Sequence, residues 1–149
     1  YPSLLIADEP TTALDVTIQA KILRNMKALQ RQYGMAIMLI THDLGVIGQM
    51  ADEVLVMYVG KKVEQATVRN IFHNPLHPYT QGLMKSIPLI GLKDKKLMPI
   101  TGSVPSPYNL PKGCYFAPRC PKAMDICHKE APLETEPEPG HLVSCWLHK

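Results

Sequence analysis

Leu4-Leu5-Ile6-Ala7-Asp8-Glu9-Pro10 is the stretch that decides the fold of this chain. Its four apolar residues predict a short strand that is buried on both faces and ends at two carboxylates. Pro10 disfavours the right-handed helical region for the residue before it, so Glu9 should stay at the strand end instead of starting a helix. Acidic residues often follow buried strands, so the neighbouring segments must decide what this pair does.

A helix and a second strand come next. Asp15 is placed as an N-cap before an amphipathic stripe, and Gly34 follows the stripe as a C-cap. The apolar run at residues 36–40 ends at Thr41-His42-Asp43. Strands that alternate with helices favour an α/β fold with parallel pairing and right-handed crossovers. The stripe is formed by Ile18, Ile22, Met26, Leu29 and Tyr33.

Parallel pairing brings polar residues together. The carboxyl ends of parallel strands meet at one edge of the sheet, which is where open α/β sheets bind ligands. Asp8 and Glu9 end the first strand and His42 ends the second. One carboxylate that binds Mg²⁺ and one that positions a water would suit phosphoryl transfer. The sequence therefore predicts an active-site edge.

The chain continues with a short helix, for which Asp43 is the candidate N-cap. A hairpin is expected at residues 54–65, with its turn at Gly60. The helix and the hairpin complete the regular half of the chain, so we place the first domain at residues 1–74.

Residues 75–149 have a different character, because they hold all four cysteines and all but two of the 14 prolines. The proline-rich segment at 99–121 excludes a long helix or a central strand. The acidic run at 134–139 is expected to be a solvated loop. We therefore predict a second, irregular Cys/Pro-rich domain at residues 75–149.

The cysteines are Cys114, Cys120, Cys127 and Cys145. They include no Cys-x-x-Cys pair of the zinc-ribbon kind. Four thiols in a segment with few core residues favour a metal centre that supplies the missing order. Zinc, with His128 or His141 replacing a thiolate, and free or oxidised thiols are alternatives.

Composition excludes several classes of protein. The 149 residues are 46% hydrophobic and 19% charged, as in an ordinary globular protein. The net charge of +3 comes without a long run of Lys and Arg, so composition gives no reason to expect a nucleic-acid partner. No apolar run approaches the roughly 18 residues of a membrane span.

The motifs taken together resemble the carboxyl half of an ATP-binding-cassette (ABC) P-loop ATPase, over essentially the whole chain. The resemblance implies Walker B at residues 4–8, with Asp8 at the Mg-ATP-coordinating position and Glu9 as the general base. It implies that Asp15, in Thr11-Thr12-Ala13-Leu14-Asp15, belongs to the D-loop that contacts a second cassette. It also implies that His42 is the switch histidine that contacts the γ-phosphate.

Two segments of the second half narrow the family. Residues 73–83 and 113–121 resemble the carboxyl-terminal extension of oligopeptide, dipeptide and nickel importer ATPases. The resemblance implies a 4Fe-4S cluster at the four cysteines, transmembrane permease subunits and a second ATPase subunit as partners, and a peripheral place on the cytoplasmic face of the inner membrane. Within it, His77-Pro78-Tyr79 is expected to be a turn and helix start.

The glycine-rich phosphate loop and the signature motif of the family do not occur in this sequence. We therefore expect a fragment that does not hydrolyse ATP alone and that self-associates through uncovered strand edges. The alternative function is a non-catalytic metal-binding interaction module. Peptide and nickel both remain open as transported substrates.

Overall fold

The computed structural model describes residues 2–86 and 99–149, and the chain forms two compact units, Tyr1–Ala51 and Asp52–Lys149. Among the described residues, no helix is both long and apolar enough to cross a membrane.

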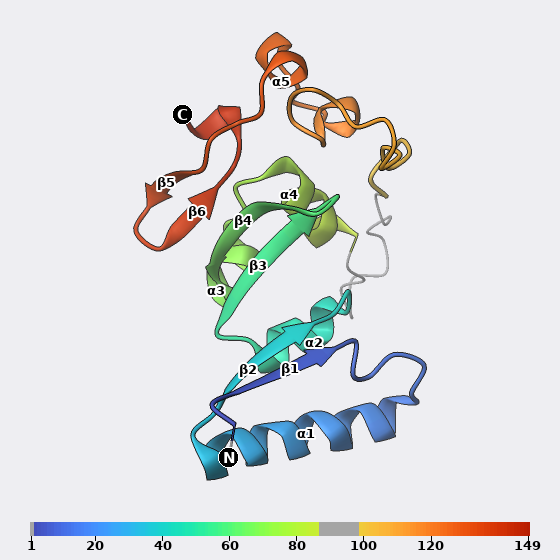
Figure 1. Cartoon of the computed structure of the whole chain (residues 1–149), viewed down its shortest axis with the longest axis vertical. Coiled ribbons are helices and arrows are strands. Elements are labelled where there is room, and N and C mark those ends of the chain that lie inside the picture. The colour runs from blue at the N-terminus through green and yellow to red at the C-terminus, as the bar shows by residue number, and fades with distance from the viewer. Residues whose placement is uncertain (1, 87–98) are drawn as a thin grey trace. The chain divides into compact units, whose positions relative to one another are not determined.

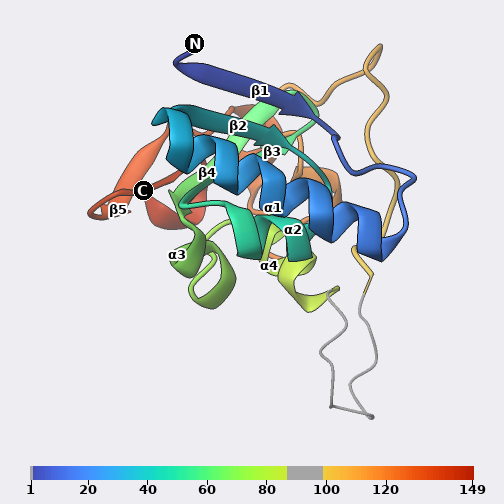
Figure 2. The same cartoon turned by 90° about the horizontal axis from the view of Figure 1, so that it is seen from below.

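The first unit consists of β1 (Leu4–Asp8), α1 (Val16–Tyr33), β2 (Ala36–Ile40) and α2 (Leu44–Met50). β1 and β2 pair in parallel, with Leu4 opposite Ala36 and Asp8 opposite Ile40 (Figure 1). α1 runs along the strand pair as the crossover between them (Figure 2). The predicted parallel β-α-β arrangement is thus present in this unit.

The predicted caps fix the ends of both helices. Asp15 accepts hydrogen bonds of 3.0 Å from the backbone N–H groups of Thr17 and Ile18 at the start of α1. Gly34 ends α1 with a left-handed φ of 64°, and its N–H donates to the carbonyl of Gln30. Asp43 caps α2 in the same way as Asp15 caps α1.

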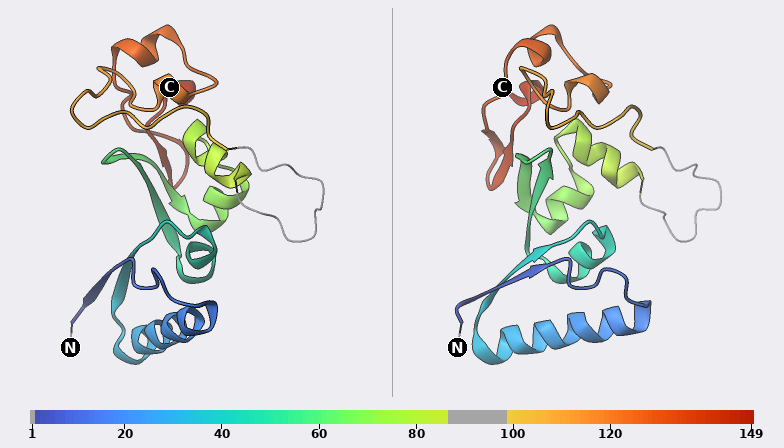
Figure 3. Two further views of the ribbon diagram at one scale, coloured as in Figure 1. Left: turned by 90° about the vertical axis from the view of Figure 1, so that its right-hand side faces the viewer. Right: turned by 45° about the vertical axis from the view of Figure 1, so that its right-hand side comes forward.

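Only one face of the strand pair is covered within this unit. α1 and α2 lie on the same side of β1 and β2 (Figure 3), where Leu23, Met26 and Val46 form a buried cluster. The strand that was expected to be buried on both faces therefore alternates between covered and exposed positions, because successive side chains of a strand point to opposite faces. The exposed positions are Leu4, Ile6, Met38 and Ile40, with 44–60% of their surface accessible.

The second unit is built on an antiparallel sheet in the order β3-β4-β6-β5, made of β3 (Glu53–Tyr58), β4 (Lys61–Thr67), β6 (His141–Val143) and β5 (Thr135–Glu138). The predicted hairpin is β3 and β4. Its helices are α3 (Val68–His73), α4 (Pro78–Lys85) and α5 (Asp125–Lys129), with single 3₁₀ turns at Ala117–Arg119 and Trp146–His148.

Strand pairing divides the chain earlier than the predicted boundary between residues 74 and 75. Glu64 and Gln65 of β4 pair with Val143 and Leu142 of β6, so the hairpin shares a sheet with the end of the chain. The compact units are divided between Ala51 and Asp52. The boundary between residues 74 and 75, which separates the nucleotide-binding domain from the carboxyl-terminal extension, stays a prediction.

The acidic run at 134–139 was expected to be a loop, but most of it is the strand β5. β5 is an edge strand, and Pro137 is tolerated there because an edge strand needs only one side of its backbone for pairing. Thr135 opposes Val143, and Glu138 opposes His141. The prediction of a loop was therefore wrong for this segment, whereas its exposure to solvent is confirmed for most of the strand.

Candidate active site

Two of the predicted site residues meet at the carboxyl ends of the parallel strands. Glu9 follows β1 and His42 comes two residues after β2, and the N–H of Glu9 extends the strand pairing by donating to the carbonyl of Ile40 at 2.8 Å. His42 Nδ1 lies 2.9 Å from Glu9 Oε1. The geometry therefore places a carboxylate and an imidazole at one edge, in direct contact.

Thr12 also holds the Glu9 carboxylate, a role that the sequence did not reveal. Its hydroxyl donates to Glu9 Oε2 at 2.6 Å, and its backbone N–H donates to the Glu9 carbonyl at 3.1 Å. In the sequence, only the spacing of three residues between Glu9 and Thr12, which suits a turn, could have indicated this contact. With His42 on one oxygen and Thr12 on the other, Glu9 has a partner for each of its oxygens.

The backbone of Glu9 has an uncommon conformation. The prediction from Pro10 was that Glu9 stays out of the right-handed helical region, and its φ of 45° is indeed left-handed. Such a value is sparsely populated by residues other than glycine and persists only when the surroundings hold it. Here the bonds to Ile40, Thr12 and His42 hold it.

The same contacts set the charge of the pair. The hydrogen bond from Thr12, and then that from His42, lowers the pKa of the Glu9 carboxyl group. The hydrogen bond to Glu9, followed by the charge of Glu9, raises the pKa of the His42 imidazole. The contact thus favours an ionised Glu9 and a protonated His42. Both side chains remain open to solvent, with 42% of Glu9 and 77% of His42 accessible, so a ligand can reach them.

Asp8 ends β1 as an exposed residue beside this pair. Within the described residues its carboxylate makes no recorded hydrogen bond or ion pair, so both oxygens are open to a ligand. A carboxylate with open oxygens suits a hard cation such as Mg²⁺.

Asp15 is the N-cap residue at the start of α1. A single oxygen, Oδ1, accepts both capping bonds, which leaves Oδ2 for another partner. Asp43 follows His42 and uses both oxygens, because Oδ1 caps α2 and Oδ2 accepts from Gln19 at 3.1 Å. The D-loop role of Asp15 stays a prediction.

The four cysteines are free thiols in the second unit. Within residues 2–86 and 99–149, no three His, Cys, Asp or Glu side chains form a group that could hold a metal ion. The predicted metal site is therefore not supported by side-chain geometry. Burial is the main cause that raises the pKa of the Cys114 and Cys120 thiols, and it raises that of Cys145 to about 11.

His141, the alternative zinc ligand, is engaged elsewhere. It is fully buried, and its Nε2 donates to Glu64 Oε1 at 2.7 Å. Its other ring nitrogen, Nδ1, is buried and has no hydrogen-bond partner within the described residues. No group of three possible metal ligands is found in the described part of the chain, so the substitution of His141 for a thiolate stays a prediction. His128 lies exposed on α5.

The helix start that was predicted at His77-Pro78-Tyr79 is confirmed, because His77 caps α4 and Pro78 is the first residue of α4.

The fold and the site define a class of protein. A parallel β-α-β unit whose carboxyl edge carries adjacent acidic residues and a histidine is typical of α/β proteins that bind a ligand at that edge. Comparison with known proteins then gives the family. Residues 63–127 match the family model described as "Oligopeptide/dipeptide transporter, C-terminal region".

Curated relatives match almost the whole chain. The oligopeptide transport ATP-binding protein AppD of Bacillus subtilis is 57% identical over 99% of this chain and 45% of its own length. The dipeptide transport ATP-binding protein DppD of the same organism is 51% identical, over 98% and 44%. The oligopeptide transport ATP-binding protein OppD of Salmonella typhimurium is 48% identical, over 97% and 43%. The chain is thus similar to peptide-transporter ATP-binding proteins over almost all of its residues, and it spans a little under half the length of the relatives it matches.

Proposed function

We propose that this chain supplies the hydrolytic edge of an ABC-type ATPase subunit that drives peptide import. The observation that carries the proposal is the 2.9 Å contact between Glu9 and His42 at the carboxyl ends of two parallel strands. The relatives named as oligopeptide and dipeptide transport ATP-binding proteins support the substrate class.

Each side chain has a chemical task in this proposal. Asp8 offers open oxygens to Mg²⁺, which neutralises phosphate charge when it is bound with ATP. Glu9 is the general base that takes a proton from the attacking water, because each of its oxygens keeps a lone pair beside its present hydrogen bond. His42 uses Nδ1 for Glu9, so Nε2 is the nitrogen left to contact the γ-phosphate.

Partners and location follow from the same proposal. The subunit would dock on transmembrane permease subunits at the cytoplasmic face of the membrane as a peripheral protein. It would pair with a second ATPase subunit, which Asp15 Oδ2 would contact across the interface, since Oδ1 already serves the helix cap. The names of the relatives support a role in transport.

The test is a Glu9→Gln substitution in a subunit that contains this chain together with a phosphate loop and signature. Glutamine keeps the shape but cannot take a proton, so ATP binding should persist while hydrolysis falls by roughly 10²–10⁴. Radiolabelled ATP retention and phosphate release measure the two quantities. The matched control is Glu130→Gln, an exposed residue of the second unit, which should leave both unchanged. Full turnover by the Glu9 variant would remove Glu9 from the role of base.

We also propose that Cys114, Cys120, Cys127 and Cys145 bind a 4Fe-4S cluster. Backbone N–H groups face each sulfur, as is usual for sulfurs that ligate metal clusters: those of Phe116 and Ala117 face Cys114, that of Lys122 faces Cys120, that of Leu147 faces Cys145, and that of Met124 lies 3.5 Å from Cys127. The other three cysteines, in their ionised form, each help to raise the pKa of the Cys145 thiol, so the four lie near one another. The cysteines would have to move closer for ligation.

Anaerobic purification tests the cluster. The protein should be brown with about four iron atoms per chain, and each Cys→Ser substitution should lower the iron content. Stoichiometric zinc without iron would replace the cluster by a zinc site. Metal-free protein with four titratable thiols would end the metal proposal.

A further inference from the structure

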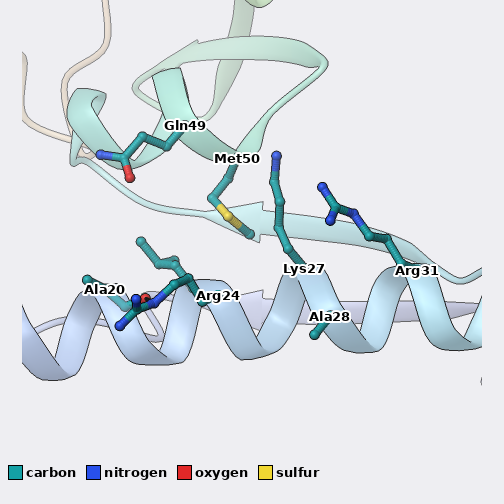
Figure 4. A pocket seen from close by; sticks show the side chains of 8 residues that line it. Ala20, Arg24, Lys27, Ala28, Arg31, Gln49 and Met50 are labelled. Carbon is teal, nitrogen blue, oxygen red and sulfur yellow. Dashed lines mark hydrogen bonds between the residues drawn. The ribbon is translucent and has the colours of Figure 1, made fainter.

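We propose that a cavity between α1 and α2 of the first unit binds a small organic anion that carries a phosphate or diphosphate group. The cavity has a volume of about 300 Å³ and lies among residues of the two helices (Figure 4). Three cationic side chains, Arg24, Lys27 and Arg31, line it together with the amide of Gln49. The inference does not depend on the proposed ATPase function.

The charge of α1 is the first argument. Its 18 residues contain four cations and no acidic residue, and α2 contains no charged residue at all. Arg24, Lys27 and Arg31 follow one another at spacings of three and four, so they are neighbours on one helix face and repel one another. A bound polyanion would remove that repulsion. The fourth cation, Lys21, lies on the same helix but does not line the cavity.

The lack of internal partners is the second argument. The structure records one hydrogen bond for these three side chains within the described residues, from Arg24 Nε to the carbonyl of Ala20 on its own helix at 3.3 Å. Two cations of the second unit show the contrast, because Lys62 pairs with Glu134, and Arg119 donates to the carbonyls of Ile100 and Thr101. The α1 cations are thus left for an external anion.

The shape of the cavity selects the kind of anion. Leu23 and Met50 give it an apolar wall. Lys27 rises from α1 beside Met50, and Arg31 follows beyond Lys27 (Figure 4). A volume of this size is at the lower end of ligand sites, which favours a small molecule. The planar fork of arginine matches phosphate oxygens two at a time. A hollow with an apolar wall and a cationic rim therefore fits a small phosphorylated molecule better than a flat lipid surface.

The cavity is separate from the candidate active site. Glu9 and His42 follow the carboxyl ends of β1 and β2, whereas the cavity is lined by the middle and the end of α1 and by the last two residues of α2. No recorded hydrogen bond joins the two groups within the described residues. A Glu9→Gln substitution should therefore leave anion binding unchanged, which distinguishes this inference from the proposed function.

The test uses the whole chain labelled with ¹³C at its methionine methyl groups and titrated with inorganic pyrophosphate at physiological ionic strength. The Met50 resonance should shift and saturate, while that of Met124 in the second unit should not move. Lys27→Gln and Arg31→Gln should each weaken binding about tenfold, the worth of one lost charged hydrogen bond. The matched control, Lys21→Gln, removes the same charge from the same helix outside the cavity and should change the affinity less than about twofold. The resonance of Met26, buried in the core, reports whether each variant folds.

Three results would overturn the inference. The first is an unmoved Met50 resonance at pyrophosphate concentrations up to roughly 1 mM, the weak end of the usual range of KM values. The second is equal weakening by Lys21→Gln, which would mean a diffuse positive field without a site. The third is binding to phosphatidylserine vesicles, abolished by the Lys27 and Arg31 substitutions, without any response to pyrophosphate, which would make this face a membrane contact.

Discussion

Glu9, Ala13 and Val59 have left-handed φ values of 45°, 61° and 46° although none of them is glycine. Each such residue costs on the order of 1–3 kcal/mol and persists only where its surroundings hold it. Two of the three lie in the turn between β1 and α1, beside the candidate active site. The turn after Asp8 therefore stores strain at the place where Thr12 and His42 fix the Glu9 carboxylate.

Asp15 has two assigned tasks, the observed helix cap and the predicted contact with a second subunit. An Asp15→Ala substitution should lower the free energy of unfolding by about 1 kcal/mol, because the N–H groups of Thr17 and Ile18 lose their acceptor. Asp15→Asn keeps the capping oxygen and removes the charge, so its stability should remain near that of the parent chain. Urea denaturation of the variants measures the cap, and ATPase activity of the assembled dimer measures the contact. Equal stability of the Ala variant and the parent would show that the cap contributes nothing.

At the scale of elements, a buried carboxylate ties three segments of the second unit together. Glu64 of β4 accepts from the backbone N–H groups of Leu76 and His77 at 2.7 and 3.0 Å, and from His141 Nε2 of β6 at 2.7 Å. Glu64 and His141 are both fully buried. The carboxylate thus joins the sheet to the loop that starts α4, a link that periodicity cannot reveal because it depends on which polar side chains are buried.

Replacing Glu64 with Gln tests this link. An amide nitrogen would face a backbone N–H or the His141 N–H where an oxygen now accepts, so the free energy of unfolding should fall by at least about 2 kcal/mol. Glu53→Gln is the control, because Glu53 is exposed on the neighbouring strand β3 and should change stability by less than about 0.5 kcal/mol. Amide exchange of Leu76 and His77 should quicken in the Glu64 variant alone. Unchanged exchange there would mean that water or another group replaces the carboxylate.

At the scale of the whole molecule, the features that were predicted best from the sequence are those that depend on local chemistry. The caps Asp15, Gly34 and Asp43 and the second strand at residues 36–40 are where they were expected, because each depends on a few neighbouring residues. The strand at 135–138 was missed because its pairing with β6 is a tertiary contact that overrides the low strand propensity of Glu and Pro.

The candidate site was also predicted in part. The meeting of Glu9 and His42 follows from parallel strands, which the alternation of strands and helices already indicates. The bond from Thr12 depends on the backbone path of a strained turn, and the unpaired face of α1 depends on which cations find no partner. Neither feature can be predicted from the sequence, because the spacing of residues does not distinguish a solvated cation from one that lines a cavity.

The second unit should lose stability in mild acid because of His77. Burial, the largest cause, lowers the pKa of His77, Glu64 opposes the shift and His148 adds to it, and the net result is a change from 6.5 to about 4. Below pH 6.5 the unfolded chain therefore binds a proton at His77, whereas the folded chain binds it only near pH 4. The free energy of unfolding thus decreases as the pH falls from 6.5 to about 4, by about 3 kcal/mol in total. Urea unfolding followed by the fluorescence of Trp146, the single tryptophan, measures this unit. His77→Asn keeps an acceptor for the N–H of Tyr79 and should flatten the pH dependence, whereas His73→Gln, at an exposed position of α3, should leave it unchanged. An equally steep loss in the His77→Asn variant would assign the acid sensitivity to other groups of the second unit.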